Sequence, residues 1–243
     1  MRAVSAGPGL AQLVLLEGRR LALHPLFLAG VVVAAGGCAA FLARGWSTSG
    51  WTVYAGFALM APFTMVATNV VTLRDHRADT VEQHEALPMP VSTRVGALLT
   101  AILAPTLLTV AGLGAVTAYA ASRFALDEVD LLVLASLPLI MTALAALGVA
   151  LARWMPSAFV APALAVAFYF WTPGDDPSAW RVLMPLNSAD DTGAAVMRLP
   201  YLLGLTLLFA GAALAQPQRS RTSVLLALVG AALVTLSAAA VLT

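Results

Sequence analysis

Lysine is absent from this chain, because all 13 of its basic residues are arginines. A P-loop ATPase holds the β- and γ-phosphates of ATP with a lysine, so the chain cannot hydrolyse ATP by that mechanism. Cysteine is almost absent as well. The single Cys38 lies in an apolar run, which excludes an intrachain disulfide and a cysteine-based metal site.

Charge of either sign is also scarce. Charged residues make up 10% of the chain, whereas a soluble domain carries about a quarter. A formal net charge of +1 leaves no concentrated basic face for a nucleic acid. What remains is apolar: 60% of residues are hydrophobic and the mean hydropathy is +0.90. Such a chain cannot cover a water-facing surface, so the lipid bilayer is its expected partner.

The apolar residues fall into long runs. A hydrocarbon core of about 30 Å requires roughly 20 apolar helical residues. Seven runs approach that length without any Asp, Glu, Arg or His, and they cover residues 26–43, 51–73, 95–121, 131–152, 155–172, 199–215 and 224–242. Backbone groups in lipid must bond within their own segment, so the runs predict helices. The expected fold is all-α, a polytopic membrane helix bundle.

The number of spans depends on one segment. Residues 155–172 form a short run that contains Pro156 and Pro162. If they form a broken or re-entrant helix, six transmembrane helices remain instead of seven and the C-terminus changes sides. Small residues within the runs, such as Gly112 and Gly114, Gly148 and Ala152, or Gly204 and Gly211, are expected at close contacts between helices.

The arginines predict the orientation. With the N-terminus in the cytoplasm, nine arginines lie inside and only Arg44, Arg123, Arg181 and Arg198 lie outside. The predicted extracellular loop 173–198 is acidic instead. The run after Arg20 is longer than a typical signal-peptide core, so we expect it to remain as the first span. These patterns predict a multi-pass protein of the cell (cytoplasmic) membrane with a cytoplasmic N-terminus.

An amphipathic segment precedes the first span. Residues 9–24 combine apolar side chains with the charged group Glu17, Arg19 and Arg20, and Pro25 follows. This pattern suits a helix that lies in the cytoplasmic interface of the membrane. The apolar residues assigned to that interface are Leu10, Leu13, Val14 and Leu21.

The predicted cytoplasmic loop 74–94 is the most charged part of the chain. Thr80 and Gln83 fit a capping box, and Pro88 ends the turn that they start. The loop therefore predicts a short cytoplasmic helix near residues 81–87, with Glu82 and Glu85 on one face. The candidate site residues of the loop are Arg74, Asp75, Arg77, Asp79, Thr80, Glu82, Glu85 and Arg94.

The order of these features resembles a known family. Leu-x-x-x-Glu-x-Arg-Arg-Leu-x-x-x-Pro (13–25), two spans, and then a loop that ends Glu-Ala-Leu-Pro-Met-Pro-Val-Ser-x-Arg (85–94) are similar to the type-2 family of ATP-binding-cassette (ABC) export permeases. The stretch 180–198, with Met-Pro-Leu-Asn at 184–187, also resembles the segment before a late span of that family.

The resemblance implies roles and partners. Residues 9–24 would be the interfacial connecting helix, and 74–94 would contain the coupling helix that docks on a separate cytoplasmic ABC ATPase. The chain would be a permease subunit and not an enzyme, and it would pair with a second permease chain as a homodimer or heterodimer. ATP and Mg²⁺ would sit on the partner ATPase, with no cofactor or metal on this chain. Spans without charge suit a hydrophobic or amphipathic cargo.

Other functions stay open from the residues alone. An ion-coupled secondary transporter usually keeps ionisable groups in its spans, and here only backbone carbonyls with Thr64, Thr68 or Asn69 are available for sodium. An intramembrane enzyme is disfavoured, because the sequence has no His-Glu-x-x-His, no Gly-x-Ser-x-Gly and no intramembrane aspartate pair. His76 and His84, with nearby acids, are a weak metal candidate. A non-transporting membrane scaffold or immunity protein is the third alternative.

Overall fold

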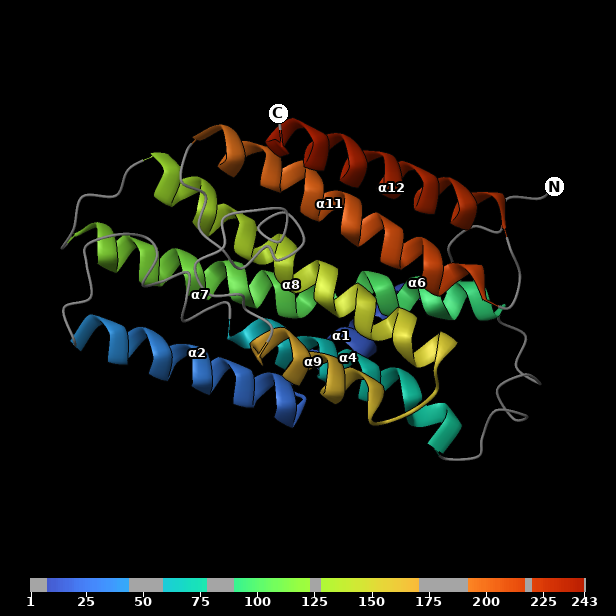
Figure 1. Ribbon diagram of the computed structural model, residues 1–243. Coiled ribbons are helices and arrows are strands. Elements are labelled where there is room, and N and C mark those ends of the chain that lie inside the picture. The colour runs from blue at the N-terminus through green and yellow to red at the C-terminus, as the bar shows by residue number, and fades with distance from the viewer. Residues whose placement is uncertain are drawn as a thin grey trace.

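The computed structural model describes residues 8–43, 59–77, 90–122, 128–170, 192–216 and 220–242, and within these ranges every regular element is an α-helix (Figure 1). The all-α class predicted from the sequence is confirmed for this part of the chain. The helices are α1 (Pro8–Ala22), α2 (Pro25–Ala43), α4 (Met60–Arg77), α6 (Val91–Ala101), α7 (Leu103–Ala121), α8 (Glu128–Trp154), α9 (Val160–Phe170), α11 (Thr192–Ala215) and α12 (Arg221–Leu242).

Four helical segments are long and apolar enough to cross a membrane: Val91–Tyr119, Leu131–Trp154, Val196–Ala215 and Arg221–Ala240. The pair α1 and α2, bent by 51°, makes a fifth if it counts as one broken span. The described part is thus consistent with a multi-pass membrane protein. It supports four to five candidate spans, against the six to seven predicted. The predicted span 51–73 corresponds to α4, and the predicted span 155–172 corresponds to α9. The eleven residues of α9 make a helix only about 16 Å long.

The helices run between two ends of the bundle (Figure 1). Helices α4, α8 and α11 finish at one end, where α6 and α12 begin. This end contains Arg74, Arg94, Arg153 and Arg221, and we call it the arginine-rich end. The opposite, remote end is where α2 and α7 finish and where α8 and α11 start. Among the described residues, most arginines therefore lie toward one end of the bundle.

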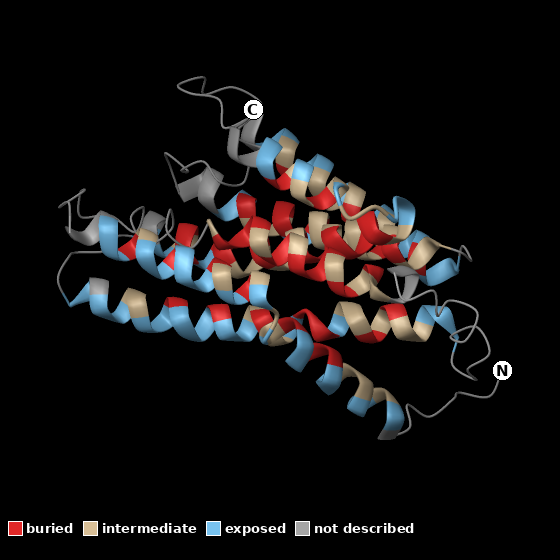
Figure 2. Ribbon diagram, turned by 90° about the horizontal axis from the view of Figure 1, so that it is seen from below, coloured by how far each residue is buried: buried red, intermediate tan, exposed pale blue. Residues whose placement is uncertain are grey.

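Helix α8 is the centre of the bundle, with 61% of its candidate span buried inside the protein. Figure 2 shows buried residues concentrated in the middle of the bundle and exposed residues along its outer helices. One apolar core at the arginine-rich end joins Leu21, Val71, Val95, Val149 and Ala213 from five different helices. A larger core toward the remote end joins α2, α4, α7, α8 and α11.

Two helix boundaries differ from the sequence prediction. Helix α4 continues through Arg77 and α6 starts at Val91, so both edges of the predicted loop 74–94 are helical. The physical reason is that hydropathy marks where a segment passes from lipid to water. A helix can continue past that boundary for as long as its backbone hydrogen bonds continue. Pro105 explains a break at Ile102, because a proline has no N–H to donate to the carbonyl four residues earlier.

Close contacts between helices depend on glycine at Gly148, Gly204 and Gly211, three of the predicted positions. A methyl group on Gly204 or Gly211 would lie within 3.0 Å of the backbone of α12, and one on Gly148 would collide with the Met65 carbonyl of α4. Gly114 is different, because a methyl group there would have no neighbour within 4 Å. The packing prediction is confirmed for the first three and is wrong for Gly114.

Candidate functional site

Helix α1 turns one face to the bundle at the arginine-rich end. Leu21 is 1% exposed and Glu17 is 4% exposed. A methyl group on Gly18 would lie 3.1 Å from Ala104 Cβ, so α1 packs against α7 just past the break at Ile102. Leu21 and Glu17 belong to the predicted interfacial helix 9–24, and the structure turns both side chains toward protein. That the helix as a whole lies in the membrane interface stays a prediction.

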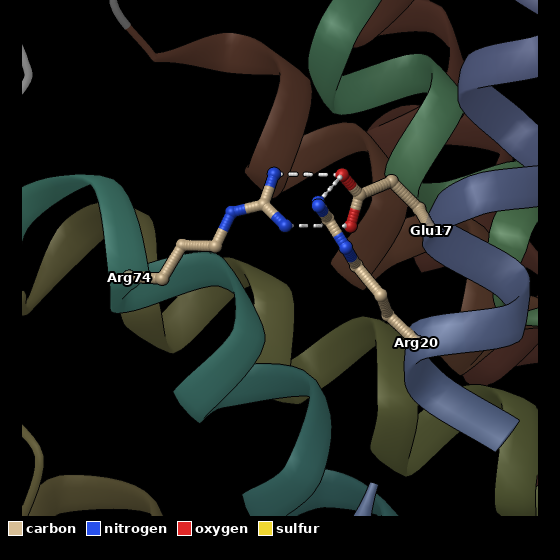
Figure 3. A network of polar contacts seen from close by, with 3 residues as sticks. All are labelled: Glu17, Arg20 and Arg74. Carbon is tan, nitrogen blue, oxygen red and sulfur yellow. Dashed lines mark hydrogen bonds and ion pairs between the residues drawn. The ribbon is translucent and has the colours of Figure 1, made fainter. Parts of the chain in front are cut away.

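Glu17 forms an ionic network with the side chains of Arg20 and Arg74 (Figure 3). Its Oε1 accepts hydrogen bonds from Arg74 Nη2 at 2.6 Å and from Arg20 Nη1 at 3.1 Å, and its Oε2 accepts one from Arg74 Nη1 at 3.2 Å. The Arg74 guanidinium therefore grips the carboxylate with two nitrogens, which fixes its direction as well as its distance. We call this network the Glu17 clasp. It connects α1 to the last turns of α4.

Helix α4 is joined to the central helix by a polar seam. Thr68 Oγ1 donates to the carbonyl of Ala145 at 3.0 Å, and Asn69 Nδ2 donates to the carbonyl of Gly148 at 3.2 Å. Thr68 and Asn69 are fully buried. These bonds are possible because Gly148 lets the two backbones approach closely. The seam fixes α4 and α8 in register, running in the same direction.

The end of α8 is in turn joined to the end of α11. Trp154 Nε1 donates to the carbonyl of Ala212 at 2.8 Å, and the Arg153 guanidinium donates to the carbonyl of Gln216. Carbonyls in the last turn of a helix have no partner within the helix, so these side chains satisfy groups that would otherwise lack one. Polar contacts thus connect α1, α4, α8 and α11 at the arginine-rich end.

The remote half is built differently. An open groove of about 780 Å³ lies between α7 and α8, and its lining is apolar except for Thr117. Gly114 and Ala118 hollow the α7 wall, while Leu113 and Leu134 are among the buried lining residues. Thr106 and Thr142 join their hydroxyls at 3.1 Å on the same helix pair, deeper in the bundle. The groove resembles a lipid-facing or cargo-facing surface in its chemistry, because it contains no charge.

The predicted site residues divide into three groups. Glu17, Arg20 and Arg74 come together in the clasp, and Arg19 lies on the opposite, exposed side of α1. Asp75 and Arg77 lie in the last turn of α4, while Arg94 lies in the first turn of α6. The rest, together with the predicted short helix at 81–87, fall outside the described residues: Asp79, Thr80, Glu82 and Glu85.

Arg198 lies in a helix, whereas the sequence predicts it at the end of the extracellular loop 173–198. It is part of α11 and is 8% exposed. Helix α11 begins at Thr192, so the apolar run that starts at 199 is only the later part of a longer helix. The sequence does contain an indication of this earlier start, since the apolar residues Val196 and Met197 directly precede Arg198. A buried arginine inside a membrane helix is a functional candidate in general.

Neither a metal site nor a similarity to a known protein identifies the function of this chain. Among the described residues, no three His, Cys, Asp or Glu side chains gather in a way that could hold a metal ion. A comparison of the chain with known protein families, curated proteins and solved structures finds no match to any of them. The features that bear on function are therefore the clasp, the polar seam and the position of α4 before the predicted coupling helix.

Proposed function

We propose that this chain is the permease subunit of an ABC exporter, which moves a hydrophobic or amphipathic cargo out of the cell with energy from a separate ATPase. The Glu17 clasp is the observation that carries the proposal. It is formed by Glu17 and Arg74, two residues 57 positions apart, and it fastens α1 to the helix that leads directly into the acidic segment 78–89. A segment that receives force needs such a connection on its membrane side.

The contacts support a path for that force. A push on the segment after Arg77 acts on α4, and α4 is tied to α1 through the clasp and to α8 through the polar seam. Helix α8 is tied to α11 through Trp154. These four helices would move as one unit, since each link is a directional hydrogen bond that resists sliding.

The apolar remote half supports the second part of the proposal. Helices α7 and α8 share only limited contact, and the groove separates them. Movement of α8 relative to α7 would change the groove at a lower energetic cost than movement within the polar seam. A surface that opens and closes without charge suits a cargo with an apolar part.

The arginine-rich end would face the cytoplasm. Positively charged residues of short loops are enriched on the cytoplasmic side of membrane proteins. Because the clasp and the end of α4 share this end, and residues 78–89 follow α4 in the sequence, the docking surface for an ATPase would face the compartment that contains ATP. A second permease chain, identical or related, would complete the pathway.

The test is a charge reversal in the predicted coupling helix. The full chain is co-expressed with candidate ABC ATPases, and complex formation and ATPase stimulation are measured in proteoliposomes. We expect E82K/E85K to lower the recovery of the complex and the stimulation at least about tenfold, the size expected when like charges replace a complementary pair at an interface. E128K is the matched control, because Glu128 is an exposed acid at the remote end.

Two results would overturn the proposal. If no ABC ATPase is retained by the wild-type chain, an exporter subunit is excluded and a scaffold or immunity protein is favoured. If the double reversal leaves stimulation intact while E128K also has no effect, the segment 78–89 is not the docking element. In either case the clasp remains a structural contact without a role in transport.

One observation favours an ion-coupled transporter as a second candidate. Asn69 is fully buried and its Oδ1 has no hydrogen-bond partner among the described residues. However, the hydroxyls of Thr64 and Thr68 donate to backbone carbonyls, so they already serve helix packing. Sodium-dependent uptake or efflux in the absence of any ATPase, abolished by N69A, would favour this candidate over the exporter.

A further inference from the structure

We propose that the outward face of α1 binds the headgroups of anionic phospholipids through Arg19 and Arg20, with Leu15, Leu16 and Leu23 inserted among the acyl chains. This lipid-binding face is opposite to the face that holds Glu17. The inference requires a membrane protein but does not require an ABC exporter, so it stands or fails separately from the proposed function.

The two faces of α1 follow from its helical geometry. Successive residues of an α-helix are rotated by about 100°, so positions 15, 16, 19 and 23 lie on one side and positions 17, 18 and 21 on the other. The exposed fractions agree with this division. Leu15, Leu16 and Leu23 are 72%, 54% and 58% exposed, and Arg19 and Arg20 are exposed among them. The lipid-binding face therefore mixes long apolar and cationic side chains.

Such a mixture matches only one environment. Three widely exposed leucines on a short helix are unfavourable in water, at roughly 25 cal/mol for each Å² of apolar surface. Two arginines are unfavourable in the hydrocarbon core. At the boundary between headgroups and acyl chains, leucines enter the apolar layer while the arginine stems extend back toward the phosphates. The 51° bend between α1 and α2 allows α1 to follow this boundary while α2 leaves it.

The charge of the face selects the headgroup. Glu17 is the only acidic residue between positions 8 and 43, and it is turned inward. The side chain of Arg19 forms no hydrogen bond or ion pair with the described part of the chain. Arg20 contacts Glu17 through one nitrogen, and its side chain stays 56% exposed. A guanidinium has five N–H donors, so Arg20 can bind a phosphate in addition to the carboxylate. The charged side chains of the outward face are thus all cationic, and anionic lipids complement them.

Other occupants fit this surface less well. An ATPase surface or a second copy of the chain would have to cover three protruding leucines and also neutralise two arginines. The acyl chains and phosphates of one lipid leaflet supply both chemistries at the same depth. We therefore assign the face to lipid, and a protein occupant is an outcome that the test can detect.

The first experiment measures lipid preference directly. The full chain is purified in detergent with equal amounts of phosphatidylglycerol and phosphatidylcholine of the same acyl length, and retained lipids are counted by native mass spectrometry. We expect the wild type to retain phosphatidylglycerol preferentially and R19Q to lose about fivefold of that preference, the size expected for one arginine close to an anionic surface. Arg19 is chosen because Arg20 also belongs to the clasp.

R221Q is the matched control. Arg221 is an exposed arginine at the same end of the bundle, and its replacement changes the net charge by the same amount. The proposal predicts no change of lipid preference in this variant. An equal loss in both variants would reduce the effect to general charge and overturn the site, and so would an unchanged preference in R19Q.

A second experiment identifies what covers the face. A spin label is placed at position 16 by L16C in a C38A background, and the protein is reconstituted in phosphatidylglycerol-containing bilayers. We expect collisions with oxygen to exceed collisions with a water-soluble nickel complex, as for a label at Leu228, which is 61% exposed on α12. Preferential access to nickel would place the face in water. Exclusion of both reagents would show a protein occupant, and either result overturns the proposal.

Discussion

The two ends of the bundle are held together by different forces. At the arginine-rich end, a buried carboxylate, two guanidinium groups, an indole and a buried amide make directional bonds across four helices. Toward the remote end, apolar packing dominates and an open groove separates α7 from α8. Directional bonds resist sliding and rotation, whereas apolar contacts allow both. The difference suggests an end that receives movement and an end that yields to it.

Substitution of glycines at the two ends is expected to give the largest difference in stability between them. We expect G148V to destabilise the protein by at least about 3 kcal/mol, because a side chain there collides with the Met65 carbonyl and overpacks the polar seam. G114V introduces the same side chain at the groove, where a methyl group meets nothing, and should be tolerated. Thermal unfolding in detergent measures both. Equal destabilisation by the two substitutions would contradict the view that one end of the bundle is rigid and the other yields.

Removal of Arg74 tests the clasp itself. We expect R74A to cost about 2 kcal/mol, because the Glu17 carboxylate stays buried while it loses its two-nitrogen partner. The loss should appear as a lower unfolding temperature, together with faster proteolysis of α1 in the native protein. R221A removes an exposed arginine at the same end, outside the clasp, and is the comparison variant. If R74A and R221A behave alike, the clasp contributes no more than surface charge does.

The smallest expected effect concerns His24, which precedes α2. Its Nδ1 accepts a hydrogen bond from the Leu26 N–H at 3.3 Å, so it acts as the N-cap of α2. Burial lowers the pKa of His24 below its ordinary value of 6.5, because the charged form is poorly solvated. Protonation also removes the acceptor. The stabilisation is therefore present above pH 6.5 and is lost as the pH falls below it.

We expect the wild type to lose up to about 1 kcal/mol of stability by this route between pH 7.5 and pH 5, the typical value of a helix cap. H24N retains a capping side chain that does not titrate. Unfolding temperatures measured across this range should fall less steeply in H24N than in the wild type. Parallel curves for the two proteins would show that His24 does not link pH to the joint between α1 and α2.

The sequence alone determined the class of the protein and the position of its polar ends. Transfer of apolar side chains from water is a local property, so hydropathy identifies segments such as α8 and α12 without any knowledge of their neighbours. The asymmetry of the arginines likewise follows from counting. The alternation of charged and apolar residues in 9–24 also predicted a helix, and α1 spans Pro8–Ala22.

Only the tertiary structure decided which faces of the helices are inside. In a membrane the lipid is as apolar as the protein core, so the hydrophobic pattern does not distinguish a lipid-facing leucine from a buried one. For this reason the sequence grouped Leu21 with the apolar residues of the interfacial face of 9–24, whereas in the structure Leu21 is buried and Leu15 and Leu16 are exposed.

The same limit applies to charges and glycines. The partner of Glu17 lies on another helix, and Arg198 is buried because α11 extends beyond its apolar run. Gly148 and Gly114 have similar neighbours along the chain, but only one of them faces a helix at close range. Each outcome depends on which helix packs alongside, and that information is carried by long-range contacts and not by the local sequence.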